Sequence, residues 1–282
     1  MMIAETPEKI QQYLAPLRTK RIALVATMGC LHKGHISLIR KAKCLADVVV
    51  VSIYINPMQF AENEDFSKYP STFEKDAEIC KNEGIDVIFR PTNLYPNDGA
   101  KVTLKVHDMS NMLCGISRPS HFDGVVTVVS ILFNIIRPNV AIFGEKDWQQ
   151  LAIIRRMVSD LHIPIKIIGS EIIRETDGLA MSSRNRYLSP SEHQKSLCLS
   201  QTMLLMKNNI QQSGKASKSI QFGIDNLRKY DIHPEYLEIR DELTLKPENN
   251  ITSQSRIFIA AKIGHTRLID NISLSIETEN TL

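Results

Sequence analysis

Residues 22–55 read IALVATMGCLHKGHISLIRKAKCLADVVVVSIYI. Two apolar runs, Ile22–Val25 and Asp47–Ile55, enclose a glycine turn and a helical pattern over Gly34–Ala46. The second run is continuous and β-branched, which is typical of a strand that is covered on both faces of a parallel sheet. The order of strand, turn, helix and strand predicts a βαβ unit.

The same alternation continues along the chain to about residue 168. Further strands are predicted at Ile85–Phe89, Val140–Phe143 and Ile165–Ile168, and further helices at Ser71–Asn82, Phe122–Ile136 and Trp148–His162. Strands that alternate with helices of this length indicate an α/β fold with a Rossmann-like, doubly wound parallel sheet.

The pattern changes near Ser189, a plausible N-cap that is followed by Pro190 and, three residues on, by Glu192. One helix is expected from there to about Asn209, and another, after the linker Gln211–Gly214, to about Tyr230. Short strands are then expected at Tyr236–Ile239, Arg256–Ala260 and Arg267–Ile272. We therefore expect a nucleotide-binding catalytic domain over residues 1–188 and a small α+β lid domain over residues 189–282.

The composition excludes several classes of protein. The 282 residues are 43% apolar and 23% charged, which argues against disorder, and the net charge of +3 argues against a dedicated nucleic-acid binder. No apolar run approaches the ~20 residues of a membrane span, and the N-terminus lacks the apolar core of a signal peptide. The five cysteines form no Cys-x-x-Cys pair, so neither a disulfide framework nor a zinc site is indicated. After these exclusions, we expect a cytoplasmic globular protein.

The strongest local signal for chemistry is Thr27–His35, which follows the first strand and opens a helix. Phosphates bind at such a turn, where strand ends meet a helix N-terminus. His32 and His35 are three residues apart, so they point the same way and could donate hydrogen bonds to phosphate oxygens. The alternative to a phosphate site is that these are two surface histidines at the start of a helix. A zinc site is a weaker hypothesis, because no third ligand lies nearby.

Two further turns are candidates for anion binding. Phe143–Gln150 closes a strand and opens a helix, and its Gly144 and Lys146 suit a phosphate contact. Met181–Arg186 carries two hydroxyls and two guanidiniums, which suit a mobile anion-binding loop. Capped or solvated surface turns are the alternatives for both.

A fourth segment, Tyr54–Phe60, follows the second strand of the βαβ unit. Its Asn56 and Gln59 are neutral hydrogen-bonding side chains at the edge of the sheet where a small polar substrate is expected. On its own the segment could be an ordinary proline turn.

Together these segments resemble the pantothenate synthetase (pantoate–β-alanine ligase) family of the HIGH-type nucleotidyltransferase superfamily. The resemblance covers nearly the whole chain, and its other segments are Asn63–Phe66, Tyr69-Pro70, Arg118–Val125, Asp177–Leu188, Tyr236–Asp241, Ala260–Gly264 and Thr266–Asn271. It implies that pantoate is adenylated by ATP with release of pyrophosphate, and that the amine of β-alanine then attacks the acyl adenylate. Pantothenate and AMP are the implied products.

The resemblance also implies roles for particular residues. His35 would be the proton donor, and His32, Lys146 and Arg184 would act with it at the phosphates. The nucleotide would be bound by Thr27, Met28, Gly29, His32, His35, Gly144, Glu145, Lys146, Asp147, Ile173, Met181, Ser182, Ser183 and Arg184. Gln59 and Gln150 would bind pantoate with Asn56 near them. Asp76 would be associated with Mg²⁺.

Asp76 and Ile173 rest on the resemblance alone, since Asp76 lies in a charged helix where a solvated face is the ordinary expectation. The sequence departs from the family's pattern at Ala26, where proline is usual, and at Ile131, where lysine is common; neither removes an assigned group. The resemblance further suggests a homodimer.

Three other functions compete with this one. A related nucleotidyltransferase with a phosphorylated acceptor would favour Arg or Lys in place of the paired Gln59 and Gln150. A class I tRNA-charging enzyme would need more basic surface than a net charge of +3 provides. A non-catalytic ATP-binding protein would be expected to have lost some of the groups at His32, His35, Lys146 and Arg184.

Overall fold

The computed structural model describes residues 1–61, 64, 66, 69–213 and 216–275, with the backbone alone for residues 211–213. Asn63 and Asp65 of the family resemblance and Gly214 of the expected linker lie outside the described residues. Contacts divide the chain into one unit of Met1–Glu145 with Ile153–Ile172 and another of Lys146–Ala152 with Ile173–Leu282. The boundary after residue 188 stays a prediction about domains.

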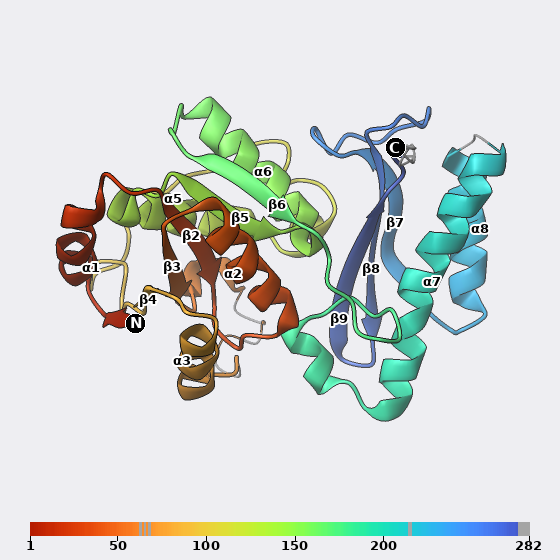
Figure 1. Cartoon of the computed structure of the whole chain (residues 1–282). Helices are drawn as coiled ribbons and strands as arrows, with labels where there is room; N and C mark the ends of the chain where they lie inside the picture. The colour runs from red at the N-terminus through yellow and green to blue at the C-terminus, as the bar shows by residue number, and fades with distance from the viewer. Residues whose placement is uncertain (62–63, 65, 67–68, 214–215, 276–282) are drawn as a thin grey trace, which may run out of the picture. The chain divides into compact units, whose positions relative to one another are not determined.

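The first unit is built on a parallel sheet with the strand order β1-β4-β3-β2-β5-β6 (Figure 1). Its strands are β1 (Met2–Ala4), β2 (Ile22–Thr27), β3 (Val48–Ile53), β4 (Val87–Phe89), β5 (Val140–Gly144) and β6 (Lys166–Ser170). All neighbouring pairs run parallel. The predicted parallel α/β sheet is therefore confirmed, although the short edge strand β1 was not anticipated.

The helices of this region are α1 (Pro7–Leu14), α2 (Lys33–Leu45), α3 (Phe73–Asn82), α4 (Cys114–Ser117), α5 (His121–Ile136) and α6 (Trp148–Asp160), with the 3₁₀ turns η1 (Ala15–Leu17), η2 (Pro57–Gln59) and η4 (Glu145–Asp147). Helices α2, α3, α5 and α6 begin and end close to the predicted residues, whereas α1 and the short α4 are not predicted by the sequence. Among the described helices of the chain, none has the length and apolar character of a membrane span.

The central strands of the sheet are buried on both faces. Val49, Val51 and Ile142 form one core cluster with side chains of α2 and α3. The alternating residues Leu24 and Val50 point to the opposite face and are fully buried as well. Central strands that are buried on both faces read as the continuous apolar runs seen in the sequence.

The second unit pairs two helices with an antiparallel sheet of order β7-β8-β9. Its elements are η5 (Ser183–Tyr187), α7 (Pro190–Ser213), α8 (Ala216–Arg228), β7 (Pro234–Asp241), β8 (Ser255–Ile263) and β9 (Thr266–Ser273). The predicted cap of α7 is confirmed: the Ser189 hydroxyl accepts from the Glu192 N–H at 3.3 Å, and the Glu192 carboxylate accepts from the Ser189 N–H at 2.8 Å. The predicted order of helices followed by strands is confirmed too.

Candidate active site

The strand order predicts where a ligand binds. From β2 the chain proceeds outward through β3 and β4, whereas β5 and β6 lie on the other side of β2. The order therefore reverses between the neighbours β2 and β5, and ligands of open α/β sheets bind beyond the carboxyl ends of the strands at such a reversal. The turns that follow these two strands are Thr27–His35 and Gly144–Asp147, two of the segments singled out by the sequence.

The turn after β2 is held in an unusual backbone conformation. The Thr27 hydroxyl donates to the Ser52 carbonyl at 2.8 Å and accepts from the Gly29 N–H at 3.1 Å. Gly29 and Cys30 then have φ angles of +84° and +56°. Such angles are easy for glycine and costly for cysteine, so the turn needs stabilisation from elsewhere.

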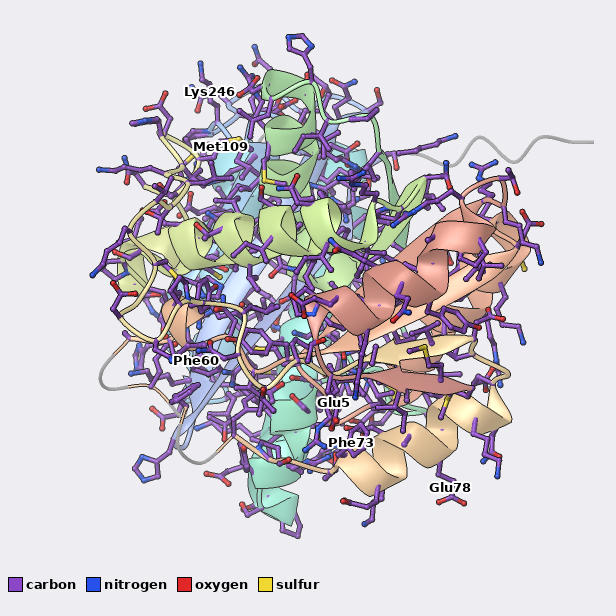
Figure 2. The ribbon with its side chains drawn as sticks, turned by 90° about the vertical axis from the view of Figure 1, so that its left-hand side faces the viewer. Glu5, Phe60, Phe73, Glu78, Met109 and Lys246 are labelled. Carbon is purple, nitrogen blue, oxygen red and sulfur yellow. The ribbon has the colours of Figure 1, made fainter. Side chains whose placement is uncertain are left out.

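Asp76 supplies that stabilisation. Its carboxylate oxygens accept from the backbone N–H groups of Cys30 and Leu31, both at 2.8 Å, and from the Thr72 hydroxyl at 3.2 Å. The side chain is 1% exposed, although Glu78 two residues later projects outward from α3 (Figure 2). The expectation of a solvated face is therefore wrong for Asp76, whose carboxylate fills a nest of two successive N–H groups.

The two histidines lie together at the start of α2. Their ring centroids are 4.1 Å apart, as the three-residue spacing predicts. His32 Nδ1 accepts from the Gly34 N–H at 3.1 Å, and His35 Nδ1 accepts from the His32 N–H at 3.3 Å. Because a backbone N–H can only donate, both Nδ1 atoms are unprotonated and each neutral ring carries its hydrogen on Nε2.

Asn56 and Gln59 form a hydrogen-bonded pair at the end of β3. The Asn56 amide, in a residue that is 1% exposed, donates to Gln59 Oε1 at 3.2 Å and to the Gly124 carbonyl at 3.1 Å. The Gln59 amide donates to the Met28 sulfur at 3.0 Å. The pair is extended by the hydroxyl of Tyr95, which donates to Asn56 Oδ1 at 2.7 Å.

The backbone of Gln59 is fixed by charged and aromatic side chains. Its carbonyl accepts from Arg118 Nη2 at 3.2 Å and from His121 Nδ1 at 2.7 Å. Arg118 in turn makes a bidentate pair with Glu64 at 2.5 and 2.7 Å. Burial alone would raise the pKa of the Glu64 carboxyl, but its hydrogen bonds and attraction to Arg118 outweigh burial, so the pKa is lowered.

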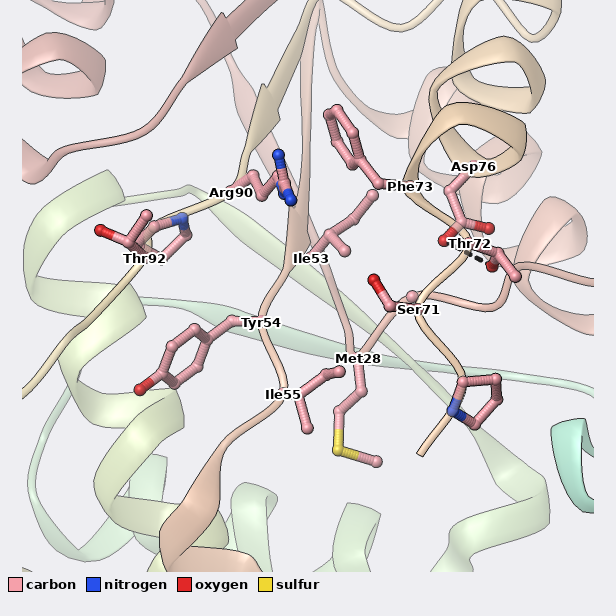
Figure 3. A pocket seen from close by; sticks show the side chains of 13 residues that line it. Met28, Ile53, Tyr54, Ile55, Ser71, Thr72, Phe73, Asp76, Arg90 and Thr92 are labelled. Atoms are coloured by element: carbon pink, nitrogen blue, oxygen red, sulfur yellow. Dashed lines mark hydrogen bonds between the residues drawn. The ribbon is translucent and has the colours of Figure 1, made fainter. Parts of the chain in front are cut away.

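A cavity of about 340 Å³ adjoins Met28. It extends along the ends of β3 and β4 to the start of α3, and Figure 3 shows the Met28 side chain, the Tyr54 hydroxyl and the Arg90 guanidinium around it. The Arg90 guanidinium lies 4.0 Å from the Phe73 ring centre. The first unit therefore has an open space lined in part by the predicted nucleotide residues Met28 and Gly29.

In the second unit, the residues at the start of α6 are anchored by the antiparallel sheet. Asn271 of β9, which is 2% exposed, donates to the Lys146 carbonyl at 3.0 Å. The Trp148 indole donates to the Glu242 carbonyl at 2.7 Å, and the Arg256 guanidinium stacks 3.4 Å from the indole. The Lys146 ammonium lies 3.9 Å from the Asp147 carboxylate. These contacts fix the backbone that carries the lysine.

The segment around residues 173–185 is braced in the same unit. The Met181 N–H donates to the Ile173 carbonyl at 2.9 Å, and Arg174 forms an ion pair with the buried Asp270 at 2.7 Å. The Ser182 hydroxyl caps η5 by accepting from the Arg184 N–H at 3.2 Å. Ser182, Ser183 and Arg184 therefore belong to one short helical turn.

The predicted site residues fall into two sets. One lies in the unit with the parallel sheet: Thr27, Met28, Gly29, His32, His35, Asn56, Gln59, Asp76, Gly144 and Glu145. The other lies in the unit with the antiparallel sheet: Lys146, Asp147, Gln150, Ile173, Met181, Ser182, Ser183 and Arg184. Sequence reasoning gave no role to three supporting residues, Tyr95, Arg118 and Asn271. The last two stand in quoted segments, whereas no sequence signal singled out Tyr95.

Comparison with known families gives one consistent result. The chain matches the family described as pantoate-beta-alanine ligase over residues 2–273. A pantothenate synthetase of Vibrio cholerae serotype O1 is 47% identical over 281 residues, covering 98% of this chain and 95% of the relative. One from Thermotoga petrophila is 45% identical over 280 residues, covering 97% of this chain and 100% of the relative.

Solved structures agree. Pantothenate synthetase from Thermus thermophilus superposes with a TM-score of 0.93 at 36% identity, covering 98% of this chain and 100% of that one. The pantoate-beta-alanine ligase of Francisella tularensis, solved in complex with beta-gamma ATP and beta-alanine, gives a TM-score of 0.78 at 34% identity, covering 97% and 98%.

Proposed function

The chain belongs to the pantoate–β-alanine ligase family, and from this premise we propose how its residues divide the work of the reaction. It is an enzyme that condenses (R)-pantoate with β-alanine at the expense of ATP, through a pantoyl adenylate, giving pantothenate, AMP and pyrophosphate. A pantoate carboxylate oxygen attacks the α-phosphorus and pyrophosphate leaves. The β-alanine nitrogen then attacks the acyl carbon, loses a proton, and AMP leaves.

The histidine pair carries the mechanistic proposal. Because both Nδ1 atoms accept backbone hydrogens, His32 and His35 present Nε2–H donors. We infer that these donors contact phosphate oxygens as negative charge builds up during attack on the α-phosphorus. His35 is the donor whose hydrogen bond strengthens most as pyrophosphate leaves.

The remaining nucleotide contacts are proposed from the positions that these residues hold in the motifs of the family. Lys146 and Arg184 neutralise the phosphates, and the Ser182 and Ser183 hydroxyls assist them. The base, ribose and phosphates of ATP are further lined by Thr27, Met28, Gly29, Gly144, Glu145, Asp147, Ile173 and Met181. The helical turn η5 closes over the triphosphate as ATP binds.

Pantoate is proposed to bind at Gln59 and Gln150, with Asn56 behind Gln59. Neutral amides suit a hydroxy acid, because they can donate to its oxygens without holding its carboxylate in an ion pair that would make the oxygen a weaker nucleophile. The anchored carbonyl of Gln59 fixes where its amide can reach.

Magnesium enters this proposal as the counter-ion of the ATP phosphates. The resemblance associates Asp76 with the metal, but its oxygens already accept three hydrogen bonds and the side chain is 1% exposed. Magnesium keeps several waters and uses open carboxylates. Asp76 therefore does not fit a direct metal ligand, and the association with magnesium that the resemblance implies stays a prediction.

Compartment and assembly are also proposals. All five cysteines are free thiols, which supports a reducing compartment such as the cytoplasm. A homodimer is proposed from the family resemblance, and light scattering behind size-exclusion chromatography would measure the mass.

Pyrophosphate release tests the function. We expect release from ATP to require pantoate, and AMP and pantothenate to appear when β-alanine is added.

His35→Ala should lower the adenylation rate about 10²–10³-fold, the loss typical of one transition-state donor. An absence of pantoate-dependent pyrophosphate would overturn the function, and a near-wild-type rate for His35→Ala would overturn the role of that histidine.

A further inference from the structure

The amide of Asn56 can point in only one direction. The Gly124 carbonyl, 3.1 Å away, can only accept a hydrogen bond, so the atom facing it must be Nδ2. The Met58 N–H, 3.3 Å from the other end of the amide, can only donate, so the atom facing it must be Oδ1. Obligatory backbone partners therefore fix both ends of a side chain that is 1% exposed.

This direction is passed on to Gln59. The second hydrogen of Asn56 Nδ2 donates to Gln59 Oε1 at 3.2 Å, which turns the oxygen of Gln59 inward. Its Nε2 group is then the end left for other partners, and it contacts the Met28 sulfur, a weak acceptor, at 3.0 Å. A ligand oxygen would be a stronger acceptor than this sulfur, so replacing one by the other is favourable.

Tyr95 completes the chain of hydrogen bonds from the far side. Its hydroxyl donates to Asn56 Oδ1 at 2.7 Å, the shortest of the five hydrogen bonds in the series. Burial, together with the neighbouring Tyr54, raises the pKa of the Tyr95 phenol, so it remains a donor at neutral pH. The phenol therefore holds Asn56 in place without a charge.

We propose that Tyr95 is a positioning residue for pantoate: through Asn56 it holds the amide of Gln59 as a hydrogen-bond donor toward a substrate oxygen. This inference rests on the proposed role of Gln59 and adds a residue that does not itself touch the substrate. It also gives the proposed pantoate site a polarity, because the Gln59 amide selects an acceptor, such as a carboxylate or hydroxyl oxygen, over a donor.

Pantoate-dependent exchange of pyrophosphate with ATP, measured without β-alanine, tests the proposal. Tyr95→Phe should raise the KM for pantoate about three- to ten-fold, the range for one lost hydrogen bond, and leave the KM for ATP unchanged. Tyr13→Phe is the matched control, since it removes a phenol hydroxyl from α1 (Pro7–Leu14), a helix of the same unit that carries none of the predicted site residues. The control should leave both KM values near those of the wild type.

A double-mutant cycle separates positioning from a general loss of packing. In a Gln59→Ala background, the further change Tyr95→Phe should no longer raise the KM for pantoate. An equal effect of Tyr95→Phe with and without Gln59, or equal changes in the two KM values, would overturn the inference. If Gln59→Ala alone leaves the KM for pantoate unchanged, the proposed function of Gln59 fails instead.

Gln59→Glu gives a readout that does not depend on the folding of a Tyr95 variant. A carboxylate there can accept from Asn56 but cannot donate to the substrate, so the KM for pantoate should rise at least as much as in Gln59→Ala. A KM close to that of the wild type would show that donor polarity is not needed and would overturn the inference.

Discussion

His32 has one task that the structure shows and one that is proposed. Its Nδ1 accepts from the Gly34 N–H and so caps α2, whereas the contact of its Nε2–H with a phosphate is part of the proposed function. An alanine at this position removes both functions at once. A variant that keeps only the cap would therefore report on the chemistry alone.

His32→Asn is such a variant, because asparagine is among the best N-cap residues and its oxygen can accept from the same N–H. We expect the unfolding temperature to stay close to that of the wild type and the adenylation rate to fall about 10²-fold or more. His32→Ala should lose about 1 kcal/mol of stability as well. Thermal unfolding and pyrophosphate release measure the two effects, and unimpaired release by the asparagine variant would argue against a phosphate contact.

Asp76 shows how a buried charge can serve backbone geometry. It satisfies the N–H groups of Cys30 and Leu31, and a β-carbon added to Gly29 would lie 3.0 Å from its Oδ2. The turn and the carboxylate are therefore fitted to each other. The sequence could not reveal this fit, because the carboxylate and the turn are about 45 residues apart and the charged neighbours of Asp76 are typical of an exposed face.

Asp76→Asn should therefore act through the turn. One carboxylate oxygen becomes an amide that faces backbone donors, so we expect a loss of about 1–3 kcal/mol in the free energy of unfolding, with slower adenylation. The dependence of the rate on magnesium concentration should keep its midpoint. Urea unfolding and a magnesium titration check both points; a midpoint shifted to much higher magnesium would instead favour a metal ligand. Glu78→Gln on the same helix is the control.

At the scale of elements, the proposed pantoate contacts depend on how closely α5 approaches η2. Gly124 lies in the first turn of α5, and a β-carbon there would lie 2.2 Å from the Met58 carbonyl oxygen and 2.8 Å from the Gln59 nitrogen. The same glycine supplies the carbonyl that orients Asn56. The approach of the two elements and the direction of the amides are thus set by one residue.

Gly124→Ala tests this approach. The methyl group would collide with backbone rather than with a flexible side chain, so α5 and η2 must separate, at a cost of about 1–3 kcal/mol. The KM for pantoate should rise, because Gln59 moves with η2. Ser130→Ala on the same helix should change neither quantity. Normal stability together with a normal KM for pantoate in the glycine variant would contradict the close packing.

The elements that were predicted from sequence are those with a strong local signal. The central strands are continuous apolar runs, and α7 has a capping box, so their positions could be predicted. Strand β1, three residues long at the edge of the sheet, carries too little pattern to be predicted. Helix α1 does carry a local signal, since Thr6 caps it and Pro7 and Glu8 stand in its first turn. Long-range supports such as Asn271 to Lys146, 125 residues apart, have no local signal at all.

At the scale of the whole molecule, the net charge of +3 does not describe the individual carboxyl groups. Both units contain carboxyl groups whose pKa is lowered. Burial raises the pKa of Glu64, but Arg118 outweighs it. The hydrogen bond from Arg40 lowers the pKa of Glu83, and hydrogen bonds to Ser189 lower that of Glu192. Each of these groups stabilises the fold when ionised. Acid should therefore weaken both units.

The sign follows from linkage. The folded-state pKa of Glu64 lies below its unfolded value of about 4.3, so its stabilisation is complete above that value and is lost as the pH falls through the folded-state pKa. Glu64→Gln should cost about 1–3 kcal/mol at pH 7, and the cost should shrink as the pH is lowered toward 3. Urea unfolding at a series of pH values measures this, with the exposed Glu78→Gln as control. A cost that stays the same down to pH 3 would mean that the Arg118 pair does not stabilise the fold through its charge.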